Sequence, residues 1–172
     1  MRVTGLTWKP FRLAFAEDFR TATTAHSAPR FREGVIVRLT TNGGISGIGE
    51  ASPLRERRGG SVDDVVRLLS ELTSAVVGMN DEELQALTAD FVARPGGAAT
   101  AFALDVAVLD VSARATDQPI AGLLAEEEGE AYAATVPVNA TIGQIEAPGA
   151  ADTAVRAQAN GYRVAKVKVG VR

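Results

Sequence analysis

Residues 136–169 read VPVNATIGQIEAPGAADTAVRAQANGYRVAKVKV, and the pattern in this stretch decides the fold. Residues 136–142 and 163–169 are rich in β-branched side chains, which predicts two strands. Between them, residues 148–160 have the spacing of an amphipathic helix, and Gly161 is suited to end that helix. A strand, a helix and a strand in succession predict a βαβ unit, with parallel strands and a right-handed crossover.

Two lysines lie on the second of these strands. Successive side chains of a strand point to opposite faces, so Lys166 and Lys168 share one face with Val164, while the other face is apolar. We expect the apolar face to lie against helices and both ammonium groups to lie inside, at the carboxyl end of the sheet, where α/β folds place active sites. Crowded cations favour one neutral amine, which is a usable general base. The alternative is an exposed edge strand with solvated lysines.

The preceding residues predict an α+β domain over residues 1–130, followed by a second domain over residues 131–172. Strands are expected at 3–12, 34–41 and 45–50, and helices at 62–76, 81–91, 98–115 and 119–124, before a glutamate-rich linker at 126–130. Ser61 with Asp64 forms a capping box, and Asn80 is suited to cap the second helix. The glycines at 43–49 lead into a strand and not a helix, so they predict a hairpin turn and no phosphate loop.

Composition excludes several classes of protein. The chain has 172 residues, a net charge of −3 and no cysteine, which excludes a polyanion-binding protein held by bulk charge, disulfides and thiolate metal sites. No apolar run approaches the roughly 18 residues that span a bilayer, and the first residues lack the apolar stretch of a signal peptide. We therefore expect a cytoplasmic protein that binds neither nucleic acid nor membrane.

Few other residues are candidates for chemistry. The only histidine, His26, lies in a long segment at 16–32, and a loop of that length is more often functional than idle, although it could be a mobile surface excursion. Asp105 and Asp110 are five residues apart on one helix and so do not share a face. We interpret Asp110 as an internal hydrogen-bond partner.

Several motifs, in order along the chain, resemble the enolase superfamily in its muconate-cycloisomerase-like branch. They are REGVIVRL at 32–39, GEASPL at 49–54, ALDVAVLD at 103–110, QPI at 118–120 with Leu123 and Leu124, and AKVKVG at 165–170 after Gly161 and Tyr162. Within this branch, the REG at 32–34 and the VPVNAT at 136–141 are most similar to o-succinylbenzoate synthase, a dehydratase of menaquinone biosynthesis.

The resemblance implies a capping domain, with a three-stranded antiparallel sheet plus helices, followed by the start of a (β/α)₈ barrel. It also implies Mg²⁺-dependent removal of the proton α to a carboxylate of a small substrate, then dehydration. Lys168 would be the base and Lys166 the neighbouring cation. Residues 16–32 and 52–58 would close over the barrel mouth and choose the substrate, with five candidates for that contact: Phe19, Arg20, His26, Phe31 and Leu54.

The chain is much shorter than the resemblance requires, because a complete barrel needs about 250 residues. The metal ligands are expected on later barrel strands, so we expect the 172-residue chain alone to bind no catalytic Mg²⁺ and to have no turnover. Dipeptide epimerases, N-acylamino acid racemases and muconate cycloisomerases share the scaffold and are alternatives. A further alternative is a non-catalytic interaction module, which would complete its βαβ part with a complementary barrel fragment or as a homo-oligomer.

Overall fold

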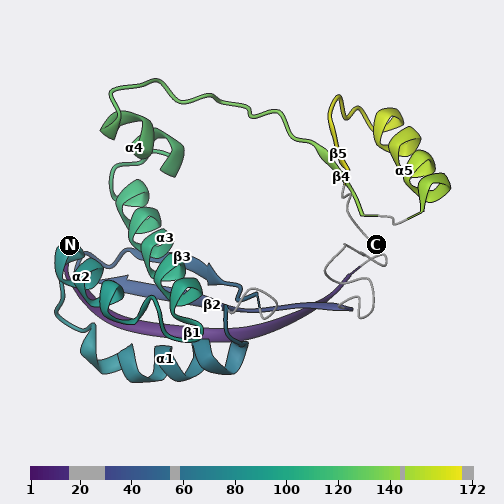
Figure 1. Cartoon of the computed structure of the whole chain (residues 1–172). Coiled ribbons are helices and arrows are strands. Elements are labelled where there is room, and N and C mark those ends of the chain that lie inside the picture. The colour runs from purple at the N-terminus through teal and green to yellow at the C-terminus, as the bar shows by residue number, and fades with distance from the viewer. Residues whose placement is uncertain (16–29, 55–58, 144–145, 168–172) are drawn as a thin grey trace. The chain divides into compact units, whose positions relative to one another are not determined.

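The computed structural model describes residues 1–15, 30–54, 59–143 and 146–167 (Figure 1). These residues form two compact units. The first unit consists of Met1–Arg12 and Glu33–Tyr132, and the second consists of the described parts of Leu13–Arg32 and Ala133–Arg172.

A three-stranded sheet forms the base of the first unit. Its strands are β1 (Val3–Ala14), β2 (Phe31–Thr41) and β3 (Ser46–Ala51), in the order β1-β2-β3. β2 and β3 are antiparallel, and their connection is a tight turn in which Gly44 has a φ of 74° and its N–H donates to the Thr41 carbonyl. The three-stranded antiparallel sheet and the hairpin turn are therefore confirmed.

Four helices follow: α1 (Val62–Ala75), α2 (Asp81–Phe91), α3 (Gly97–Ala115) and α4 (Ile120–Glu127). The predicted capping box of α1 is present, since the Asp64 N–H donates to Ser61 Oγ at 3.2 Å and the Ser61 N–H donates to Asp64 Oδ2 at 2.9 Å. Asn80 caps α2 in the same way, together with Glu83. The expected linker differs in part, because α4 continues through Glu127.

The core of the first unit lies between one face of the sheet and the helices (Figure 1). On β2, Val35, Val37 and Leu39 are fully buried, whereas Ile36 and Arg38 between them are exposed. The other face of the sheet is therefore left uncovered by the described helices.

Small residues allow α3 to lie directly on β3. A Cβ atom at Gly47 would collide with the carbonyl oxygen of Ala107, and one at Gly49 would collide with that of Ala103. Further along the helix, Asp110 Oδ2 accepts the Ile48 N–H at 2.9 Å, and Arg114 pairs with the same carboxylate. Ile48 lies on an edge strand, so Asp110 satisfies a backbone donor that the sheet leaves open. The interpretation of Asp110 as an internal partner is confirmed.

The second unit contains β4 (Ala140–Ile142), α5 (Ala147–Ala159) and β5 (Ala165–Val167). The two strands are parallel, with Ala140 opposite Ala165 and Ile142 opposite Val167, which confirms the βαβ unit. Both strands are shorter in the described residues than the sequence predicts. Ala165 and Val167 are exposed, contrary to the expectation of an apolar face held against helices, because a sheet of two strands and one helix has too few elements to cover both faces.

Candidate functional site

The candidate catalytic position lies on β5. Lys166 is opposite Thr141 of β4, one residue before the last described residue of the strand, and its side chain is exposed. Both residues are the middle ones of their described strands, and α/β folds place reactive groups at the carboxyl end of such parallel strands. Lys168 lies outside the described residues, so its pairing with Lys166 stays a prediction.

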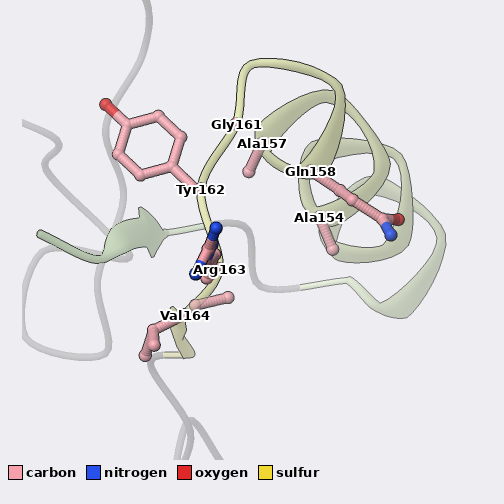
Figure 2. A pocket seen from close by; sticks show the side chains of 8 residues that line it. Ala154, Ala157, Gln158, Gly161, Tyr162, Arg163 and Val164 are labelled. Atoms are coloured by element: carbon pink, nitrogen blue, oxygen red, sulfur yellow. The ribbon is translucent and has the colours of Figure 1, made fainter. Parts of the chain in front are cut away.

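A hollow of about 530 Å³ lies close to this strand (Figure 2). Figure 2 shows that Ala154, Ala157 and Gln158 line it from α5, while Arg163 and Val164 line it from the segment that enters β5. These two residues precede the strand, so the hollow is at the amino end of β5, and its lining reaches Ala165, the residue before Lys166. Reactive groups in α/β folds lie at the carboxyl end of the strands, so we do not assign this hollow to the substrate.

A second hollow, of about 580 Å³, lies in the first unit where β3 ends. It is mostly apolar, and Leu54 and Phe102 are its large side chains; the other lining residues are Glu50, Ser52, Pro53, Gly59, Ala98 and Ala99. Ser52 Oγ donates a hydrogen bond to Glu50 Oε1 at 2.5 Å, which connects these two polar residues in the lining of the hollow. This hollow contains part of the segment that the sequence assigns to substrate choice.

Phe102 is the residue that sequence reasoning missed. Its helix is apolar on most sides, yet 63% of the surface of Phe102 is exposed. The signal that could have located Phe102 is the pair Ala103 and Ala107, one turn apart, which marks the face of α3 that contacts β3. Phe102 lies off that face and reaches the hollow beside Leu54.

The predicted loop residues divide into two groups. Leu54 and Phe31 are described and exposed, Leu54 in the hollow of the first unit and Phe31 at the start of β2. Phe19, Arg20 and His26 lie outside the described residues, so their roles stay predictions.

Two kinds of feature are missing from the described residues. None of their helices combines the length and the apolar character that a membrane crossing requires. Within the same residues, no three or more His, Cys, Asp or Glu side chains gather in a way that could hold a metal ion. The arrangement therefore offers one exposed amine on β5 and an apolar hollow after β3, and no ligand set for Mg²⁺ in the described part of the chain.

Residues 9–125 match the family model described as mandelate racemase / muconate lactonizing enzyme, N-terminal domain. The chain belongs to this family, within the enolase superfamily. The match covers the second half of β1, all of β2 and β3, the helices α1, α2 and α3, and most of α4, which fits the architecture of a capping domain.

Three relatives of this chain are each about twice as long as the chain itself. A hydrophobic dipeptide epimerase of Citrifermentans bemidjiense is 29% identical over 162 residues, which are 92% of this chain and 43% of that protein. The L-Ala-D/L-Glu epimerase structure from Bacillus subtilis is 23% identical, with a TM-score of 0.84 over 100% of this chain and 46% of its own. A dipeptide epimerase structure from Methylococcus capsulatus, complexed with Mg and the dipeptide L-Arg-D-Lys, is 25% identical, with a TM-score of 0.80 over 97% of this chain and 46% of its own. The chain thus spans less than half the length of these relatives.

Proposed function

We propose that this chain is the N-terminal part of an enzyme that epimerises a small carboxylate substrate at the carbon next to the carboxylate. The observation that carries the proposal is the family match over residues 9–125, together with 29% identity to a dipeptide epimerase over most of the chain. In this proposal residues 1–130 are the capping domain and residues 131–172 begin the barrel.

In the proposed reaction Lys168 is the base. Its neutral amine takes the α-proton of the substrate and becomes an ammonium group, and the electron pair of the broken C–H bond moves into the carboxylate to form an ene-diolate. A second acid of the complete enzyme would then give a proton to the other face of that carbon, which yields the epimer, and the Lys168 ammonium group would lose its proton to solvent. Lys166, two residues earlier, supplies the positive charge that favours the neutral form of Lys168 and stabilises the developing oxyanion.

Mg²⁺ is part of the proposal only for the complete enzyme. The dipeptide epimerase structure from Methylococcus capsulatus is complexed with Mg, whereas the described residues of this chain do not form a ligand set. Residues outside the described part would therefore have to hold the ion, whose chemistry is to stabilise the negative charge of the ene-diolate.

The hollow beside Leu54 supports a role for the capping domain in substrate choice. Leu54 and Phe102 present exposed apolar surface, and such a surface favours a substrate with an apolar side chain. We propose that Leu54 acts at this position in the complete enzyme, and that Phe19, Arg20, His26 and Phe31 act from the other capping segment.

A dehydratase like o-succinylbenzoate synthase is the second candidate. Its support is the REG at 32–34 and the VPVNAT at 136–141, which occur at the start of β2 and around β4. Both candidates begin with the same proton removal. They differ in the second step, because the dehydratase loses a hydroxyl group whereas the epimerase returns a proton.

The decisive experiment first measures the intact mass of the protein that the native source produces. We expect a mass about twice that of this 17.9 kDa chain, or larger. The purified native-length protein is then incubated with Mg²⁺ in deuterium oxide, in one series with a panel of L,L-dipeptides and in another with a cyclohexadiene carboxylate, and the substrate signals are followed by NMR. Epimerisation predicts loss of the α-proton signal and appearance of the epimer, whereas dehydration of a cyclohexadiene carboxylate predicts a new product instead.

The Lys168→Ala variant tests the proposed base. Loss of a general base is expected to lower kcat by about 10²–10⁴-fold. Arg156→Ala is the matched control, because Arg156 is an exposed cation on α5 and should leave kcat unchanged. A native protein of 17.9 kDa, or a Lys168→Ala enzyme of undiminished kcat, would contradict the proposed role.

A further inference from the structure

The uncovered face of the sheet in the first unit carries a groove. It has a volume of about 450 Å³ and runs over β1 and β2. Apart from the half-buried Trp8, its lining consists of Thr7, Lys9, Pro10, Phe11, Ile36 and Arg38, and more of the exposed lining is apolar than polar. Ile36 is 37% exposed although the residues on either side of it in β2 are fully buried. We call this surface the basic groove.

Both charged side chains of the basic groove are cations. No carboxylate lines it, and neither Lys9 nor Arg38 takes part in an ion pair within the described part of the chain. A nearby cation behaves differently, because Arg12 Nε lies 3.2 Å from Glu33 Oε1 across the same two strands. The chain as a whole has a net charge of −3, so this surface is locally positive on an acidic protein. They favour a partner that combines carboxylates with apolar groups.

The same unit carries a segment with that chemistry at the end of α4. Residues 123–132 read LLAEEEGEAY, in which Leu124 is 45% and Tyr132 is 50% exposed. The four glutamates, all exposed, are Glu126, Glu127, Glu128 and Glu130. We call residues 123–132 the acidic segment. None of its carboxylates forms an ion pair within the residues that the structure describes.

The position of these glutamates adds a second argument. α4 ends at Glu127, and its last turn contains no basic residue. The carboxyl end of a helix has a partial negative charge, so carboxylates there are unfavourable and cations are favourable. A cation supplied from outside the helix would therefore stabilise it as well as neutralise the glutamates.

We propose that the basic groove binds the acidic segment of a second copy of this chain. Lys9 and Arg38 would pair with the glutamates, and Phe11 and Ile36 would contact Leu124 and Tyr132. Each copy carries both surfaces within its first unit, so two copies can exchange them around a two-fold axis and bury both grooves. The product is a homodimer whose stability depends on salt, because exposed charges contribute to it.

Sedimentation equilibrium of the protein at the length that its native source produces tests this proposal directly. We expect a dimer of twice the subunit mass at protein concentrations up to about 0.1 mM. Its Kd should rise at least about tenfold between about 0.05 and 0.5 M salt. A chain that stays monomeric over this range, or a dimer that ignores salt, would overturn the proposal.

Charge reversal identifies the two surfaces. Lys9→Glu/Arg38→Glu and Glu127→Lys/Glu128→Lys should each raise Kd by about tenfold or more, and the combination of both pairs should restore association. Arg156→Glu/Arg163→Glu in the second unit is the matched control for Lys9→Glu/Arg38→Glu. It changes the net charge by the same amount and should leave Kd unchanged. Circular dichroism checks that every variant is folded. Failure of the combined variant to associate would assign the dimer to another surface.

The only tryptophan of the chain provides an independent readout, because Trp8 lines the groove. A synthetic peptide of sequence LLAEEEGEAY should change Trp8 fluorescence in a saturable way, whereas LLAQQQGQAY should bind at least about tenfold more weakly. The Lys9→Glu/Arg38→Glu variant should lose this preference for LLAEEEGEAY over LLAQQQGQAY. Equal responses to both peptides would show that the groove takes apolar ligands without using its cations, which contradicts the proposal.

Discussion

Both units of this chain contain many apolar side chains, but the two units differ in how many of these side chains they bury. In the first unit, apolar residues from the sheet and from α1, α2 and α3 form one core. In the second unit, Ile142 and Ala157 are the buried apolar residues among those described, while Val136, Val138, Val155, Val164 and Val167 are exposed. The difference lies in the number of helices and strands, since one helix packed on two strands cannot enclose the apolar side chains of all three elements. An apolar sequence therefore produces a core only where enough elements are present to close around it.

The largest expected effect separates the two units directly. Leu104 is fully buried in the first unit, whereas Val155 on α5 is 65% exposed. Leu104→Ala should lower the free energy of unfolding by about 2–5 kcal/mol, because it removes buried methyl groups and leaves a cavity. Val155→Ala should change it by no more than about 0.5 kcal/mol. Urea denaturation followed by Trp8 fluorescence measures the effect of Leu104→Ala, since Trp8 packs against the core of the first unit, whereas the effect of Val155→Ala needs a signal from the second unit.

If Val155→Ala proved as costly as Leu104→Ala, the second unit would have a packed core in solution, and the contrast between the units would disappear. Far-UV circular dichroism complements the fluorescence, because it also follows α5. The two signals should give different transitions if the units unfold separately.

A smaller effect is expected at the close contact between β3 and α3. Gly49→Ala places a Cβ atom against the carbonyl group of Ala103, which belongs to the helix backbone and cannot rotate away. The resulting displacement of α3 should cost about 1–3 kcal/mol. Gly43→Ala is the matched control, since nothing lies within 4 Å of a Cβ atom there. Thermal unfolding of the two variants should therefore differ clearly, and an unchanged Tm for Gly49→Ala would show that the helix and strand are not in direct contact.

Local signals in the sequence were enough to predict most of the first unit. Ser61 and Asn80 predict where α1 and α2 begin because the capping interaction depends only on residues three positions away. The hairpin between β2 and β3 is equally local. The exposure of Phe102 could not be predicted in this way, because it depends on which face of an almost wholly apolar helix meets the glycines of β3.

The candidate site was harder to predict from the sequence, for a related reason. The period of the strand places Lys166 and Lys168 on one face, but whether that face lies inside depends on elements that cover the opposite face. In the structure β5 is exposed throughout its described length, so the alternation alone did not predict burial. The basic groove shows the same limit, since Lys9 and Arg38 are 29 positions apart in the sequence and become neighbours on one surface only through pairing of β1 with β2.

The smallest expected effect concerns pH and again belongs to the first unit. The hydrogen bonds from the Ser61 side chain and backbone, with the nearby Arg67 guanidinium, hold the pKa of Asp64 below its usual value. A carboxyl group with a lowered pKa stabilises the folded state above its unfolded pKa, and this contribution disappears as pH falls through the folded value. The difference in unfolding free energy between the native chain and Asp64→Asn should therefore be constant near neutral pH and shrink below about pH 4. Asp63→Asn is the matched control, because it removes a charge from the same first turn without removing a capping bond. Identical pH profiles for the two variants would mean that the charge near the helix end, and not the capping box, stabilises α1.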